Sequence, residues 1–138
     1  MKTALIVDDS KIMLEILYAE LASEDMIVVP VESGREALAW LQTNRADVVT
    51  TDINMPEMDG FAFLAEMKRQ CGAACPPFLV VSSEERRGRP QEAVASDAVG
   101  WVTKPFAFGS LSALIARHLA MVAANDYGPD VPPAAYRA

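Results

Sequence analysis

The sequence predicts an α/β protein in which a doubly wound parallel sheet carries helices on both faces. Three observations support this fold class: five apolar runs rich in β-branched residues, a helical pattern after each run, and polar side chains where the runs end. A strand followed by a helix, repeated five times, favours right-handed crossovers that set the strands parallel. The length of 138 residues fits one compact domain.

The five apolar runs are predicted to be strands. Three of them are almost continuous valine, isoleucine and leucine, which is typical of strands buried on both faces of a parallel sheet. Pro30 stands in the second run, and because proline donates no ladder hydrogen bond we expect this strand at an edge of the sheet. The predicted strands are residues 3–7, 26–31, 47–51, 77–81 and 99–103.

The first three helices have recognisable starting signals. Ser10 is expected to cap a helix over residues 11–23, in which apolar residues recur at helical spacing. Residues 33–36, Ser-Gly-Arg-Glu, read as a capping box ahead of the second helix. The third helix is predicted to open with Asp59 and to close with basic residues that favour its dipole.

The last two helical segments differ in strength. Residues 110–124 are apolar on more than one face of a helix, as in a helix that packs closely on its neighbours. Residues 89–98 have only a thin helical periodicity, and Gly88 and Pro90 stand at their start. We therefore expect the fourth helix to be short or irregular.

Composition restricts the class of partner and the compartment. The formal charge of -7 and the pI near 4.6 oppose nucleic-acid binding, which needs a basic surface. The start of the chain resembles neither a signal peptide nor a membrane span, so a cytoplasmic protein is expected. Residues 125–138 contain three prolines and a glycine and are predicted to be a flexible C-terminal tail, which leaves residues 1–124 as the domain.

Two smaller features have ordinary explanations. Cys71 and Cys75 have no second pair and no nearby histidine to complete a metal site, so they are expected to be reduced thiols. A regulatory disulfide between them is the alternative. Arg86, Arg87 and Arg89 form the densest basic cluster and are expected to be a solvated surface.

Polar residues at the strand ends indicate where a site would lie. In a doubly wound sheet the carboxyl ends of the strands share one edge, and ligands bind in the crevice there. Four strands bring carboxylates, hydroxyls and an amine to this edge: Asp8, Asp9, Asp52, Ser82, Ser83, Thr103 and Lys104. We therefore expect a charged pocket at this edge.

The chemistry of this pocket favours phosphoryl transfer. Three carboxylates repel one another unless a cation neutralises them. Mg²⁺ suits the set, since it takes carboxylates, keeps several waters and coordinates phosphate oxygens. Lys104 and Ser82 offer a positive charge and a hydrogen-bond donor to a phosphoryl oxygen. Asp52 can then be the nucleophile and form an acyl phosphate.

Four motifs resemble the receiver domains of two-component response regulators, and among these the stand-alone chemotaxis type. They are LIVDDS (5–10), TDINMPEMDG (51–60), VVSSEE (80–85) and GWVTKPF (100–106), which stand in the family's order and cover residues 3 to about 120. The resemblance implies a flavodoxin-like fold with five parallel strands in the order 2-1-3-4-5 and five helices.

The resemblance also implies a phosphorylation-controlled signalling switch and not an enzyme. The phosphoryl donor would be a phosphohistidine on a sensor histidine kinase or phosphotransfer protein, and Asp52 would accept the group. A downstream protein would bind the surface formed by the fourth helix, the fifth strand and the fifth helix. The expected state is a cytoplasmic monomer or weak dimer that binds neither nucleic acid nor membrane.

The family resemblance assigns the metal ligands. Asp9 and Asp52 would ligate Mg²⁺ directly, together with the backbone carbonyl of Asn54. Asp8 would act on the ion through a water molecule. Magnesium is the only cofactor that the resemblance implies.

The resemblance also assigns the residues that handle the phosphoryl group. Lys104 would contact it, and Ser82 would move inward to hydrogen-bond it. Trp101 would follow as the aromatic switch residue. Asn54 and Glu84 occupy the two positions that tune self-dephosphorylation, and they match the chemotaxis combination, which implies a short-lived phosphoryl state.

Some positions depart from the family's pattern. Trp101 replaces the usual tyrosine or phenylalanine, and Ser82 replaces the commoner threonine. Asp97 stands where glycine is usual, and aspartate tolerates the left-handed backbone that such a turn would require. Pro105 follows Lys104, as in the family's lysine–proline pair, which is often cis.

Four alternatives remain open from the sequence. A magnesium-dependent aspartyl-phosphate phosphohydrolase would usually carry a second aspartate where Asn54 stands. A flavin carrier would need a phosphate loop where DDSK (8–11) stands. A receiver fold could also serve as an unphosphorylated adaptor. His118, the only histidine, could be a phosphorelay residue, although we expect it to be a partly exposed helix residue.

Overall fold

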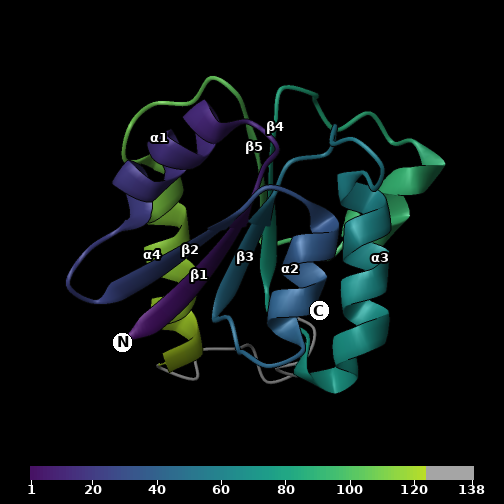
Figure 1. Cartoon of the computed structure of the whole chain (residues 1–138). Coiled ribbons are helices and arrows are strands. Elements are labelled where there is room, and N and C mark those ends of the chain that lie inside the picture. The colour runs from purple at the N-terminus through teal and green to yellow at the C-terminus, as the bar shows by residue number, and fades with distance from the viewer. Residues whose placement is uncertain (124–138) are drawn as a thin grey trace.

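The computed structural model describes residues 1–123 and contains the five-stranded parallel sheet that the resemblance implies. Its strand order is β2-β1-β3-β4-β5 (Figure 1). Pro30 lies on β2, opposite Ile6 of β1, so the predicted edge position is confirmed. The predicted tail, 125–138, and the domain end at residue 124 lie outside the described residues. The strands are β1 (Lys2–Val7), β2 (Met26–Val31), β3 (Val48–Thr51), β4 (Phe78–Ser82) and β5 (Gly100–Thr103).

Helical segments follow all five strands, as predicted, and the fourth, expected to be short or irregular, is a short 3₁₀-helix. Proline at its first position lacks an N–H, and the carboxylate of Glu92 accepts the N–H groups of Arg87 and Gly88 just ahead of it. The α-helices are α1 (Lys11–Leu21), α2 (Gly34–Leu41), α3 (Gly60–Cys71) and α4 (Ser110–Ala123). The 3₁₀-helices are η2 (Pro90–Ala95), after β4, and η1 (Gly72–Ala74), directly after α3.

The predicted helix caps are present. Ser10, Ser33 and Asp59 cap α1, α2 and α3, each accepting the backbone N–H three residues ahead. The capping box of α2 differs in one bond. The carboxylate of Glu36 accepts the N–H of Glu32, one residue before the N-cap, instead of the N–H of Ser33 itself.

Two apolar layers cover the two faces of the sheet. Because side chains alternate along a strand, Leu5 and Val7 of β1 face one layer, and Ala4 and Ile6 face the other. The first layer comes from α2, α3 and η2, and the second from α1 and α4. Figure 1 shows the same division, with α2 and α3 on one side of the strands and α1 and α4 on the other. Both faces are covered, as the continuous apolar runs indicate.

A buried carboxylate joins the two helices of the second layer. Glu20 lies on α1 with 7% of its surface exposed, and its oxygens accept the N–H groups of Gly109, Leu111 and Ser112 at 2.8–3.2 Å. Gly109 directly precedes α4, and the other two N–H groups belong to its first turn, where N–H groups have no intrahelical partners. The negative charge also suits the positive end of the helix dipole. Glu20 therefore fixes the start of α4, a role that helical periodicity did not predict.

Candidate functional site

Strand register brings the predicted acidic residues together at the carboxyl edge of the sheet. Val7 of β1 pairs with Thr51 of β3, so the residues that follow, Asp8 and Asp52, lie side by side. Carboxylate oxygens of Asp8, Asp9 and Asp52 all lie within 4.8 Å of one another. Asp8 and Asp52 are buried, with 1% and 8% of their surface exposed, whereas Asp9 is exposed. We call this cluster of two buried carboxylates and one exposed carboxylate the acidic pocket.

Lys104 follows β5, the edge strand at the opposite end of the sheet from β2, and its side chain reaches this pocket. Ser82 of β4 pairs with Thr103 of β5, and the next N–H, that of Lys104, donates to the carbonyl of Ser82 at 2.8 Å. The bond from Lys104 to Pro105 is cis, as the resemblance implies. The ammonium lies 2.7 Å from Oδ2 of Asp8 and 3.3 Å from Oδ2 of Asp52. One positive charge is thus shared between two carboxylates.

The pocket has more negative charge than Lys104 compensates. Burial raises the pKa of Asp8 above its ordinary value, although hydrogen bonds from Lys104 and from the backbone N–H of Ser10 act to lower it. A further cation would stabilise the charged form of a carboxylate that is this buried. The donor set of three carboxylates fits a hard, oxygen-liganded ion such as Mg²⁺.

Short hydrogen bonds hold Asp52 and the residue that follows it, Ile53. The N–H of Ile53 donates to Oδ1 of Asp52 at 2.7 Å, and the N–H of Gly60 donates to the carbonyl of Ile53 at 2.7 Å. Gly60 lies so close that a Cβ there would stand 2.1 Å from the carbonyl oxygen of Asp52. Glu57, in the middle of the loop, has φ of 68°, a left-handed conformation that the sequence did not indicate.

Ser82 and Trp101 meet at the loop that follows β4. Ser82 is fully buried, and its Oγ accepts the N–H of Glu84 at 3.2 Å. Nε1 of Trp101, on β5, donates to the carbonyl of Glu84 at 2.9 Å. The indole ring also contacts Phe61, with 6.3 Å between ring centroids, and the guanidinium of Arg86, 5.3 Å from the ring centroid. Trp101 is therefore half-buried against the chain that leads out of the pocket.

Asn54 and Glu84 lie at the rim of the pocket, each two residues beyond a strand-end side chain. A hydrogen bond from the Asn54 side chain, followed by one from Arg89, lowers the pKa of Glu84. Arg89 also pairs with Glu92, and its guanidinium lies 5.5 Å from the ring centroid of Phe61. The prediction of a simple solvated cluster is therefore wrong for Arg89, because nearby carboxylates and an aromatic ring hold its side chain.

Two other predictions from the sequence are corrected by the structure. Asp97 does not adopt a left-handed backbone; its carboxylate pairs with Lys68 at 2.6 Å instead, so the turn is held by an ion pair. His118 is buried, with 8% of its surface exposed, and not partly exposed as expected. It lines a cavity with Asp97 and Val99 at the start of β5, on the face where α4 packs.

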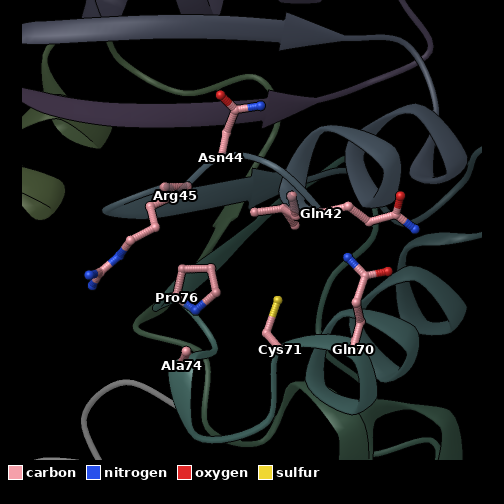
Figure 2. A pocket seen from close by; sticks show the side chains of 9 residues that line it. Gln42, Asn44, Arg45, Gln70, Cys71, Ala74 and Pro76 are labelled. Carbon is pink, nitrogen blue, oxygen red and sulfur yellow. The ribbon is translucent and has the colours of Figure 1, made fainter.

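The cysteines lie away from the acidic pocket, at the amino end of the strands. A cavity of about 310 Å³ lies there between the ends of α2 and α3. Figure 2 shows Cys71 and Gln70 on one side of it and Gln42 on the other. Both thiols are free, and burial raises the pKa of Cys75 to about 11, which opposes thiolate chemistry. Within residues 1–123, no helix combines the length and the apolar character needed to cross a membrane.

Comparison with known proteins supports the resemblance found in the motifs. The chain matches the family model of the response regulator receiver domain over residues 4–116. It is 36% identical over 117 residues to a protein-glutamate methylesterase/protein-glutamine glutaminase of Symbiobacterium thermophilum, covering 82% of this chain and 32% of that protein. It is 36% identical over 105 residues to the transcriptional regulatory protein GlrR of Escherichia coli, covering 73% of this chain and 22% of that protein. The chain thus spans less than a third of the length of either relative.

Solved structures give the same result. The chemotaxis protein CheY4 of Vibrio cholerae superposes with a TM-score of 0.76 and is 35% identical, covering 85% of this chain and 98% of that structure. The response regulator TrrA of Thermotoga maritima, solved in complex with Mg²⁺ and BeF, gives a TM-score of 0.73 at 26% identity. That match also covers 85% of this chain and 98% of that structure.

Proposed function

Because this chain belongs to the response regulator receiver domain family, whose members are phosphorylation-controlled signalling switches, we propose that Asp52 is its phosphoacceptor. The observation that supports this choice is the position of its carboxylate between a lysine and two further aspartates. Asp8 is more deeply buried, and Lys104 lies closer to it than to Asp52, whereas Asp9 is exposed on the rim. Among the three aspartates, only Asp52 is both partly accessible to solvent and in contact with the Lys104 ammonium.

The proposed reaction moves a phosphoryl group from a phosphohistidine to Asp52. A carboxylate oxygen of Asp52 attacks phosphorus, the P–O bond forms, and the P–N bond of the donor breaks. The imidazole that leaves takes up a proton from solvent, and the carboxylate becomes an acyl phosphate. Such a transfer needs mainly in-line positioning and charge stabilisation.

The residues around Asp52 supply both requirements. The hydrogen bond from the Ile53 N–H to Oδ1 orients the carboxylate, and Oδ2, which lies 3.3 Å from the Lys104 ammonium, would be the attacking atom. Lys104 then neutralises charge on the transferred group, and the hydroxyl of Ser82 donates to one of its oxygens. Asp9, Asp52 and the backbone carbonyl of Asn54 would hold Mg²⁺, with Asp8 acting through water. When bound, the ion would neutralise negative charge on the phosphoryl group and on the carboxylate cluster.

Intact mass measurement tests the acceptor. The chain is incubated with acetyl phosphate and magnesium, and the addition of a single phosphoryl group is expected for the wild type. The Asp52→Asn variant is expected to gain none, because its amide oxygen is a poor nucleophile and forms no acyl phosphate. Chelation of magnesium is expected to suppress the reaction of the wild type by about 100-fold or more.

Two results of this experiment would contradict the proposal. Equal phosphorylation of wild type and Asp52→Asn would exclude Asp52 as the acceptor. Turnover of unrelated phosphate esters in the same sample would favour the phosphohydrolase alternative.

Trp101 is the proposed switch residue, together with Ser82. Its indole donates to the carbonyl of Glu84, and the N–H of Glu84 donates to Ser82, so one peptide segment links the two side chains. If Ser82 turns to a phosphoryl oxygen, it gives up that acceptor role and the segment carrying Glu84 moves. The movement would alter the surface of η2, β5 and α4, where we place the contact with the downstream protein.

Fluorescence tests this switch. We expect Trp101 emission to change when beryllofluoride, a phosphoryl mimic, is added with magnesium. Trp40 is the only other tryptophan and lies on α2, so a Trp40→Phe variant isolates the signal. Unchanged emission in a sample shown by mass to bind the mimic would contradict a role for Trp101.

The remaining parts of the proposal concern partners and lifetime. A sensor histidine kinase or phosphotransfer protein would supply the phosphoryl group in the cytoplasm, with the chain acting as a monomer or weak dimer. Asn54 and Glu84 would tune the rate at which the phosphoryl group is lost. This role of Asn54 and Glu84 is supported by their position at the rim of the acidic pocket and by the hydrogen bond between them.

A further inference from the structure

The carboxylate of Glu84 connects two loops at the rim of the acidic pocket. On one side it accepts from the Asn54 side chain, two residues after Asp52. On the other side Nη2 of Arg89 donates to its Oε2 at 2.8 Å. The loop that follows β3 and the segment that follows β4 are therefore joined, side chain to side chain, beside the proposed acceptor.

Arg89 itself is held in place by three separate contacts. Besides its contact with Glu84, its Nε donates to Oε1 of Glu92 at 3.4 Å, and its guanidinium lies over the ring of Phe61 of α3, 5.5 Å from the centroid. Glu92 is fixed in turn, because its two oxygens accept backbone N–H groups at 2.7 and 2.8 Å. A side chain with this many contacts is not a mobile surface arginine.

The partial burial of the Arg89–Glu84 ion pair indicates that this contact helps to hold the two side chains together. The Arg89 and Glu84 side chains are 36% and 32% exposed, whereas the Glu92 side chain is only 6% exposed. A half-buried ion pair within a network is screened less by water than an isolated surface pair. The planar guanidinium can also reach two carboxylates at once, which a lysine ammonium on a flexible stem does less well.

We propose that Arg89 is a positioning residue of the phosphorylation site, which holds Glu84 against Asn54 and thereby restricts the access of water to a phosphoryl group on Asp52. This inference rests on the proposed function. Hydrolysis of the acyl phosphate requires a water oxygen to attack phosphorus in line while the bond to the Asp52 oxygen breaks. The carboxylate is regenerated, and inorganic phosphate and a proton leave.

The hydrogen bonds of Glu84 explain how restriction would work. A carboxylate that already accepts from Arg89 and from an amide has fewer free lone pairs with which to orient an attacking water. Without Arg89, Glu84 is free to leave Asn54, and both side chains become available to water.

The lifetime of the phosphoryl group tests the inference. Wild type and Arg89→Gln are phosphorylated with acetyl phosphate and magnesium, the donor is removed, and the loss of phosphoryl mass is followed. We expect the loss to be about fivefold faster in Arg89→Gln, the factor that corresponds to about 1 kcal/mol of activation free energy. Arg89→Lys retains the positive charge but lacks the planar set of guanidinium donors. Its rate of phosphoryl loss is expected to lie between those of wild type and Arg89→Gln.

A double-mutant cycle separates positioning from a general loss of structure. If Arg89 acts through Glu84, then Arg89→Gln has no further effect on the lifetime in a Glu84→Gln background. Arg69→Gln is the matched control, since Arg69 pairs with Glu66 at 2.8 Å on the exposed surface of α3. This control removes the same charge and is expected to leave the lifetime unchanged.

The outcomes distinguish this inference from the proposed function. Equal lifetimes in wild type and Arg89→Gln, a longer lifetime in Arg89→Gln, or an effect that persists in the Glu84→Gln background would each overturn it. The role of Asp52 would still stand in those cases. If the wild type accepts no phosphoryl group, the proposed function fails and the inference fails with it. Should Arg89→Gln not fold, Arg89→Lys and the Glu84 variant provide the comparison.

Discussion

Replacing Lys104 by methionine is expected to slow the phosphorylation of Asp52 by acetyl phosphate by about 100-fold or more. Removal of one preorganised group that stabilises developing charge typically has an effect of this size. Lys104 is the cation that the structure places within hydrogen-bonding distance of both Asp8 and Asp52. The initial rate of phosphoryl gain, followed by intact mass at saturating magnesium, measures the change.

The same variant is expected to be less stable when magnesium is absent. The Asp8 side chain is 1% exposed, and losing its partner leaves a buried carboxylate uncompensated, at a cost of roughly 3 kcal/mol. Lys11→Met serves as the control, because Lys11 is 83% exposed and its contact with Glu32 is long, at 3.9 Å. A Lys104→Met variant that is phosphorylated at the wild-type rate would show that the ammonium plays no part in the transfer.

Replacing Gly60 by alanine is expected to lower the free energy of unfolding by about 3 kcal/mol. The new Cβ would stand 2.1 Å from the carbonyl oxygen of Asp52 and 2.8 Å from Cα of Ile53. Both are backbone atoms, so relief requires the loop after Asp52 to shift, and overpacking of this kind costs up to about 3 kcal/mol. Alanine forms helices better than glycine does, so only the clash makes this substitution destabilising. Urea unfolding measures the change.

A second glycine provides the matched control. A Cβ at Gly34, the first residue of α2, would approach mainly the flexible end of Met58, whose sulfur lies 2.9 Å away. Gly34→Ala is therefore expected to lose clearly less stability than Gly60→Ala and to retain phosphorylation. If the two variants were equally stable, close approach to the Asp52 carbonyl would not be the reason for glycine at position 60.

The parts of the site that depend on strand ends could be predicted from the sequence. Apolar runs end at Val7 and Thr51, and parallel pairing in register brings Asp8 and Asp52 together without any information on side chains. The position of Lys104 follows in the same way from the pairing of Ser82 with Thr103. The edge position of β2 follows from Pro30, because the missing N–H is a local property.

The parts that depend on contacts between distant side chains could not be predicted. Glu20 on α1 gives no sign in its own helix that it caps α4, about 90 residues later. Asp97 stands where glycine is usual, and aspartate would tolerate a left-handed turn there, but the structure instead pairs its carboxylate with Lys68 on α3. The contacts of Arg89 depend on how η2 packs against α3, which a weak helical pattern does not specify. Long-range pairs of this kind become visible only in the folded chain.

The position of the phosphoryl group in the wild-type chain is the most direct measurement of all. After incubation with acetyl phosphate and magnesium, borohydride reduction converts an acyl phosphate to an alcohol, which peptide mass spectrometry can locate. The modified residue is expected to be Asp52, in the peptide segment that runs from β3 into α3. A reduced residue at Asp8 or Asp9, or a phosphoryl group on His118 that resists reduction, would contradict the assignment of Asp52 as the acceptor.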